Sequence, residues 1–195
     1  MELLYITSAR IPTEKANGIQ IMKMCEAFQR QGMNVTLIVP TRWQPAAMSG
    51  IIDLWEYYEI DTRFELRYIP TPDFLRFERV LPRKLVRSLY YLQCFLFSFS
   101  ALLLTFRRPH AVYYTRSLQT LFVLCLTKWL HRKDVYFEAH ELHGDPSHSH
   151  PGRMLLSQVM NWMLRHLDGL VVITRRLQEL YATFSIPEHN ICVAP

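Results

Sequence analysis

Two short segments combine residue types that could do chemistry. Asn17-Gly18-Ile19-Gln20 lies between an apolar stretch and an amphipathic one, where free amides at a helix start favour an anion such as phosphate. Both Asn17 and Gly18 are able to take positive φ, which would let the backbone approach such a group. The alternative is an ordinary helix entry without a ligand.

The second segment, Phe137-Glu138-Ala139-His140-Glu141, places carboxylates and an imidazole where another apolar stretch ends. Open parallel sheets bind ligands at the carboxyl ends of their strands, so we expect Gly18 and His140 at the same edge of one sheet. The alternative for these polar side chains is a capped strand end whose groups are satisfied within the protein.

Two further apolar stretches also end in polar residues. Tyr113-Tyr114-Thr115-Arg116 and Val172-Ile173-Thr174-Arg175-Arg176 would bring hydroxyl and guanidinium groups to the same edge. Arginine binds phosphate or carboxylate with two parallel hydrogen bonds. Equally, Thr174 could cap a helix, with the arginines solvated.

A histidine-rich run continues from the second segment. It offers a metal site as an alternative reading, but His140-Glu141-Leu142-His143 does not match the spacing of zinc proteases or of common zinc motifs. We therefore expect no metal, and a polar loop after the strand. The members of this run are Glu138, His140, Glu141, His143, Asp145, His148 and His150.

Positioning these groups requires alternating strands and helices. Periodicity predicts helices at 19–31, 83–106, 118–130, 154–166 and 175–184, the first of them stopped by Gly32. About seven apolar strands alternate with these helices, which predicts an α/β fold, a Rossmann-like parallel sheet with helices on both faces. The predicted strands are 3–7, 35–39, 64–69, 111–115, 135–139, 169–174 and 190–194.

Composition limits the function classes. With 195 residues and 50% hydrophobic residues the chain can bury one large core, and its net charge of +5 suits an anionic partner. We expect a cytoplasmic protein without a signal peptide, with Cys25, Cys94, Cys125 and Cys192 reduced in the core. The six glycines form neither the dinucleotide-binding nor the P-loop fingerprint, and the missing glycine fingerprint also argues against a sugar epimerase.

Residues 88–106 carry no charge and are long enough to cross a bilayer. We favour a helix packed on the sheet, because a membrane span would split the alternating pattern. Basic residues at the start of this segment could instead rest on anionic lipid, or simply be solvated. They are Arg76, Arg79, Arg83, Lys84 and Arg87.

Taken together, these motifs resemble the N-terminal domain of retaining glycosyltransferases of family 4, which have the GT-B fold. Asn17-Gly18-Ile19-Gln20 stands in place of the family's glycine pair, and Gly32-Met33-Asn34-Val35-Thr36-Leu37 resembles its next motif. The segments ending at Arg116, Glu141 and Thr174 follow in the family's order. The last residues, Val193-Ala194-Pro195, resemble the start of the linker to a second domain.

The resemblance implies sugar transfer from a nucleotide diphosphate sugar to a sugar or lipid-linked acceptor, with retained configuration and no cofactor. It assigns His140 to the reacting sugar and Asn17 and Gly18 to the donor. Residues 1–195 would form the acceptor-side domain, inactive without the nucleotide-sugar-binding domain. The acceptor side would use Gln20, Arg116, Glu138, Glu141 and Thr174.

Partners expected on this reading are the donor, the acceptor, the chain's own C-terminal domain and an anionic surface at the inner membrane face, but no nucleic acid. Two other classes stay open. A Rossmann-like module could bind a ligand without catalysis, and a metal-dependent hydrolase could use the residues from His140 to His150.

Overall fold

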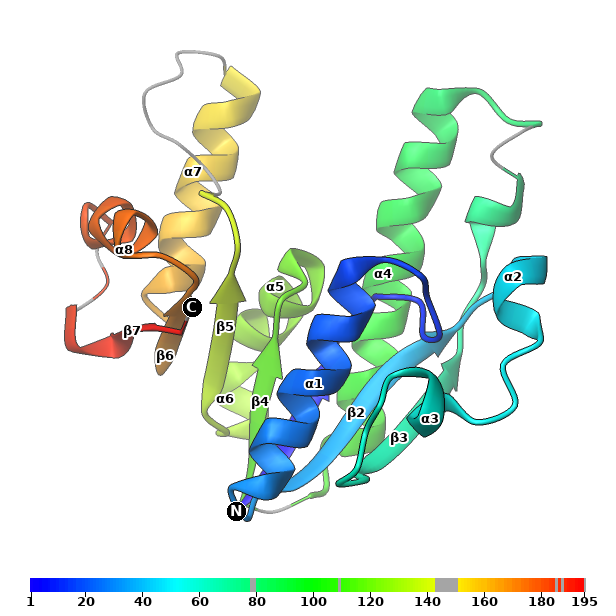
Figure 1. Cartoon of the computed structure of the whole chain (residues 1–195). Helices are drawn as coiled ribbons and strands as arrows, with labels where there is room; N and C mark the ends of the chain where they lie inside the picture. The colour runs from blue at the N-terminus through cyan, green and yellow to red at the C-terminus, as the bar shows by residue number, and fades with distance from the viewer. Residues whose placement is uncertain (78–79, 109, 143–150, 185, 187, 195) are drawn as a thin grey trace. The chain divides into compact units, whose positions relative to one another are not determined.

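A computed structural model of the chain describes residues 1–77, 80–108, 110–142, 151–184, 186 and 188–194, without the side chains of 151–154 and 188. The chain forms two compact units, Met1–Val112 and Tyr113–Pro195. Each unit alternates strands and helices (Figure 1). The prediction of an α/β, Rossmann-like fold with about seven parallel strands is confirmed, with three strands in the first unit and β4 to β7 in the second.

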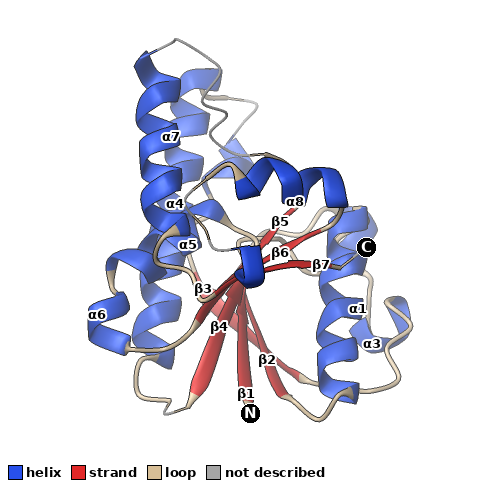
Figure 2. Cartoon of the chain, turned by 90° about the vertical axis from the view of Figure 1, so that its left-hand side faces the viewer, coloured by secondary structure: helices blue, strands red, loops and turns tan. Residues whose placement is uncertain are grey.

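The first unit is built on three parallel strands in the order β3-β2-β1. Central residues such as Leu4, Tyr5 and Leu37 are fully buried, because helices cover both faces of these strands. Figure 2 shows α1 and α3 on one side of the strands and α4 on the other. The elements are β1 (Glu2–Ile6), α1 (Ala16–Arg30), β2 (Asn34–Thr41), α2 (Ala46–Ser49), α3 (Leu54–Tyr57), β3 (Glu65–Pro70), a 3-10 turn η1 (Phe74–Phe77) and α4 (Arg83–Thr105).

The second unit continues the pattern with four parallel strands in the order β4-β5-β6-β7. Helices α5 to α7 lie on one side of these strands and α8 on the other (Figure 2). Phe137 and Leu170 are fully buried between the layers. The elements are β4 (Ala111–Thr115), α5 (Leu118–Leu126), α6 (Lys128–His131), β5 (Val135–Ala139), α7 (Pro151–Leu164), β6 (Gly169–Val172), α8 (Arg175–Ala182), a 3-10 turn η2 (Glu188–Asn190) and β7 (Ile191–Val193).

Helix α4 packs against the strands, as predicted for residues 88–106. It contacts β1 and β3, and its buried face includes Cys94, Phe97 and Ala101. It is also the one helix among the described residues that is long and apolar enough to cross a membrane, with 39% of its most apolar window buried. Buried core helices pass the same test, so length and composition alone do not decide between the two environments.

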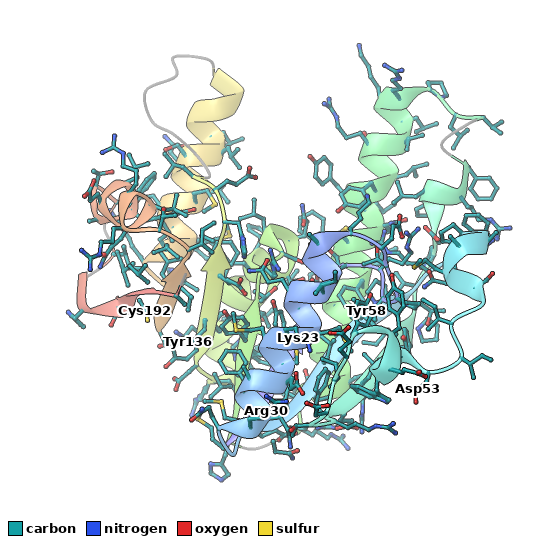
Figure 3. The ribbon with its side chains drawn as sticks, in the orientation of Figure 1. Lys23, Arg30, Asp53, Tyr58, Tyr136 and Cys192 are labelled. Atoms are coloured by element: carbon teal, nitrogen blue, oxygen red, sulfur yellow. The ribbon has the colours of Figure 1, made fainter. Side chains whose placement is uncertain are left out.

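Two expectations were wrong in detail. The single helix predicted for 118–130 is broken at Thr127, whose hydroxyl donates a hydrogen bond of 2.6 Å to the Val123 carbonyl within the preceding turn. The Thr127 backbone, with φ −104° and ψ 9°, departs from helical values and divides the segment into α5 and α6. Of the four cysteines expected in the core, three are buried but Cys192 is exposed on β7 (Figure 3).

Candidate functional site

A cavity of about 550 Å³ opens in the first unit beside the carboxyl ends of β1 and β2. This volume lies within the usual range of small-molecule sites. The segment after β1 supplies Ser8, Ala9 and Arg10, and the end of β2 leads directly into Arg42 and Trp43. The remaining lining residues are Thr13, Lys15, Asn17, Asp73, Leu75, Arg76 and Tyr90.

Asn17 lines this cavity. Its assignment to the donor stays a prediction. Neither Asn17 nor Gly18 takes positive φ, however. Helix α1 begins at Ala16, so Asn17 and Gly18 lie in its first turn, and positive φ among the described glycines occurs only at Gly32. The Gly18 N–H already donates to the Lys15 carbonyl at 2.9 Å.

Gly18 is required by close packing instead. A Cβ built on it would lie 2.2 Å from Thr13 Cγ2 and 3.1 Å from the Tyr58 hydroxyl oxygen. Its binding of a donor remains a prediction, since its position at the start of α1 is unchanged, but the argument from backbone freedom no longer supports it.

Tyr58 fixes the loop that leads to α1, and sequence reasoning missed this role. The Thr13 N–H donates to the Tyr58 hydroxyl at 2.7 Å, and that hydroxyl donates to the Thr13 carbonyl at 2.9 Å. Burial raises the pKa of Tyr58 to about 12, so the phenol stays neutral and can donate. Only its place in an aromatic-rich connection marked it in the sequence.

The second unit holds a chain of hydrogen bonds across β5 and β4. His140 Nε2 lies 2.5 Å from Glu138 Oε1, and the Tyr114 hydroxyl donates to Glu138 Oε2 at 3.0 Å. Glu138 is buried, with 2% of its side chain exposed, whereas 26% of His140 is exposed. The Glu138 carboxylate thus orients the imidazole. Because Glu138 is buried, this geometry favours a positioning role for it over a direct contact with an acceptor.

The remaining predicted residues of this unit also follow strand ends. Arg116 is half-buried after β4, Glu141 is exposed after β5 and Thr174 is exposed after β6. Because these strands are parallel neighbours, the three residues and His140 share one edge of the unit. Thr174 Oγ1 accepts from the Leu177 N–H at 3.1 Å, so the helix-cap alternative is confirmed for Thr174. Gln20 is half-buried on α1 in the first unit.

The metal reading finds no support in the described part of the chain, where no three histidine, cysteine, aspartate or glutamate residues are grouped to hold an ion. Four members of the run proposed for it lie outside the described residues. These are His143, Asp145, His148 and His150.

Parallel strands linked by helices place this chain among the Rossmann-like α/β domains, a class whose members bind ligands at the carboxyl ends of their strands. The sequence profile of the glycosyl transferase 4-like domain matches residues 18–195. The chain belongs to this family. No curated protein matches it significantly.

Solved structures share its fold at low identity. HepE from Anabaena, crystallised with UDP and glucose, has 11% identity and a TM-score of 0.56 over 99% of this chain and 43% of its own. The UDP-GlcNAc 2-epimerase of Neisseria meningitidis, bound to UDP-GlcNAc, has 13% identity and a TM-score of 0.59, with 99% and 46% covered. Apo UGT2 of Phytolacca americana has 15% identity and a TM-score of 0.58, with 100% and 51% covered.

The chain spans about half the length of each of these proteins, and it has the fold of one half of a GT-B protein. An epimerase shares this fold, so the fold alone does not distinguish epimerases from transferases. The family match, rather than the fold, favours a transferase.

Proposed function

We propose that the protein is the acceptor-side half of a retaining glycosyltransferase that uses a nucleotide diphosphate sugar. The match to the glycosyl transferase 4-like domain over residues 18–195 carries this proposal. Two structural neighbours were solved with UDP or a UDP-sugar, which supports a donor of this kind. The reaction needs no cofactor on this proposal, and the donor's nucleotide would be held mainly by a second domain.

His140 is the group proposed to face the reacting sugar. If its Nε2–H donates to Glu138, the neutral ring keeps a lone pair on Nδ1 that can accept from a sugar hydroxyl. Arg116 and Glu141 at the same edge would contact substrate, with Glu138 holding His140 in place. In the first unit, Asn17 and Gln20 would contact the ligand from the first turns of α1.

The test is a transfer assay on the protein joined to its second domain, with the anomeric configuration of the product read by NMR. Retention supports the proposal, and an inverted product contradicts it. The 195-residue chain alone should bind UDP-glucose weakly, because most nucleotide contacts would lie in the other domain. Micromolar or tighter binding by calorimetry would contradict that division of labour.

A non-catalytic binding module is the competing function. The site cavity and the family fold would serve such a module equally well. It predicts that the joined protein binds a sugar ligand but neither consumes the nucleotide sugar nor forms a glycosidic product. Product formation that stops in His140→Ala would exclude it.

We also propose that the protein works in the cytoplasm at an anionic membrane surface. Helix α4 exposes an apolar stripe with helical spacing, opposite its buried face. Exposed cations Arg83, Lys84 and Arg87 begin the same helix and would meet lipid phosphates. The stripe consists of Leu85, Leu92, Leu96, Phe99 and Leu103, each at least 42% exposed.

Sedimentation with vesicles tests this attachment. Vesicles containing phosphatidylglycerol should bind the protein, vesicles of phosphatidylcholine alone should not, and high salt should release most of it. Leu96→Asp together with Leu103→Asp should abolish binding, while Leu126→Asp, at another exposed leucine, should not. Retention at high salt that only detergent reverses would favour a membrane span instead.

A further inference from the structure

Two residues that line the cavity of the first unit carry unsatisfied hydrogen-bonding atoms, one an acceptor and the other a donor. Within the described residues, Asp73 Oδ1 and Arg10 Nε are buried atoms that have no hydrogen-bond partner, and both residues line the cavity. The other carboxylate oxygen of Asp73 accepts from the Trp43 backbone N–H at 3.0 Å, which fixes the side chain. A buried polar atom without a partner costs stability, so such atoms point to a group that completes them.

Asp73 Oδ1 and Arg10 Nε require different hydrogen-bond partners. Asp73 Oδ1 can only accept, so it requires a donor such as a hydroxyl, whereas Arg10 Nε–H can only donate and requires an oxygen acceptor. Arg10 also pairs with Glu14 at 3.0 Å through its terminal nitrogen, which holds the guanidinium in position. A ligand carrying both hydroxyls and acceptor oxygens matches this arrangement.

The positive charge of the cavity lining limits the class of ligand further. Lys15, Arg42 and Arg76 join Arg10 in the lining, against the single lining carboxylate of Asp73. Aromatic rings hold two of these cations, with the Arg42 guanidinium carbon 5.8 Å from the centre of the Tyr90 ring and that of Arg76 5.4 Å from the centre of the Phe77 ring. A stacked guanidinium keeps its N–H edge for carboxylate or phosphate oxygens.

Trp43 adds an apolar surface to this polar site. Its side chain is 60% exposed at the cavity although its backbone is tied to Asp73. A large exposed aromatic face beside fixed polar groups suits the C–H face of a sugar ring, which is apolar while its edge carries hydroxyls.

We propose that this cavity binds an acidic sugar, a ring bearing hydroxyls together with a carboxylate or phosphate, as the acceptor of the reaction. Asp73 takes a hydroxyl, Arg10 takes a ring or hydroxyl oxygen, Arg42 and Arg76 take the acid, and Trp43 covers the ring face. The acceptor role rests on the proposed transferase function, but binding of the acidic sugar can be measured without any turnover.

The test uses the side-chain N–H signals of the chain's four tryptophans in ¹⁵N-labelled protein. Trp43→Phe identifies the Trp43 signal. Glucuronate and glucose 1-phosphate represent the two acid types, glucose the neutral ring and inorganic phosphate the acid alone. At least one acidic sugar should shift the Trp43 signal. It should also bind about tenfold or more tightly than glucose and than phosphate, the gain in affinity expected when one ion pair is added.

Two arginine variants distinguish binding in the cavity from a nonspecific effect of the protein's positive charge. Arg42→Gln should weaken the acidic sugar about tenfold or more. Arg63→Gln should not, although Arg63 is likewise stacked, 5.9 Å over Trp55, because it lies outside the cavity lining. Equal weakening by both variants, glucose or phosphate binding as tightly as both acidic sugars, or an unmoved Trp43 signal would overturn the proposal.

The tighter of the two acids identifies the group that the site prefers. Failure of this inference is distinguishable from failure of the proposed function. Transfer to neutral sugars alone would leave a transferase with a different acceptor class, whereas acid binding without any transfer would leave the site and remove the reaction.

Discussion

Glu138 lies between His140 and Tyr114, with one carboxylate oxygen 2.5 Å from His140 Nε2 and the other 3.0 Å from the Tyr114 hydroxyl. The buried acid sits on β5 and the tyrosine on the neighbouring strand β4, so strand pairing sets the position of the imidazole. Removing any one member should therefore affect the proposed reaction in a graded way.

In the protein joined to its second domain, His140→Ala should lower kcat about a hundredfold to a thousandfold, with a smaller change in KM. A group that meets charge developing at the sugar carbon acts mainly in the transition state. Glu138→Gln should lower kcat less, because the histidine is still present but is held without a charged partner. Steady-state kinetics measure both effects.

Two histidines provide the control for this assignment. His148→Ala and His150→Ala should leave kcat nearly unchanged, because no metal role is assigned to them. An active His140→Ala beside an inactive His148→Ala would reverse the assignment and restore the metal hydrolase.

Gly18→Ala should lower stability by about 1–3 kcal/mol, since its new methyl group would overlap the Thr13 methyl group 2.2 Å away. Thermal unfolding followed by circular dichroism measures the change. Adding Thr13→Ser removes the clashing methyl group and keeps the hydroxyl, so the double variant should regain most of the loss. Gly50→Ala should be tolerated, because a Cβ there meets nothing within 4 Å.

Glu26 should make stability depend on acid pH. Its buried carboxylate accepts from the Thr62 and Asp61 N–H groups at 3.0 and 2.8 Å and from Arg30 at 2.9 Å. Figure 3 shows Arg30 and Lys23 on α1, and both form ion pairs with this side chain. The hydrogen bond from Thr62, first among these contacts, lowers the pKa of Glu26 below its usual 4.5.

A lowered folded-state pKa stabilises the protein above about pH 4.5, and this stabilisation is lost as pH falls through the folded value. Glu26→Gln should therefore cost about 1–3 kcal/mol in urea unfolding at pH 7 and less as the pH drops below 4.5. Glu179→Gln, which removes an exposed pair with Arg176, should cost under about 1 kcal/mol at either pH. A Glu26→Gln penalty that does not change with pH would contradict the prediction.

His131 should make the stability of the protein depend on pH near neutrality. Its Nε2–H donates to the Leu124 carbonyl at 2.9 Å while Nδ1 accepts from the Lys133 N–H at 3.0 Å, an arrangement that only the neutral ring can make. Burial lowers its pKa from 6.5, so its contribution to stability is complete above that pH and is lost as the pH falls through the lower folded value.

The wild-type protein should lose stability between pH 7.5 and the acid side of 6.5 more steeply than His131→Gln, which cannot titrate. Urea unfolding at a series of pH values measures this difference. His189→Gln, at an exposed histidine, serves as the matched control and should keep the wild-type slope. Identical slopes in all three proteins would show that His131 does not titrate as described.

Local sequence was sufficient for the strands. Continuous apolar runs such as residues 3–6 predicted β1 correctly, because a strand buried on both faces needs no partner-specific information to be recognised. Helix ends were less secure. The helix predicted for 118–130 is interrupted at Thr127, whose backbone departs from helical angles, and apolar periodicity does not encode such a local change.

The site divides in the same way. Residue order alone placed Arg116, His140 and Thr174 after strands, because carboxyl ends of parallel strands meet at one edge. Only the tertiary structure showed Tyr58 fixing Thr13, Glu138 buried behind His140, and Arg42, Trp43 and Asp73 gathered around one cavity. Tyr58 lies 45 residues from Thr13, and Asp73 lies 30 residues from Trp43. Contacts over such separations depend on how the chain packs rather than on any local pattern.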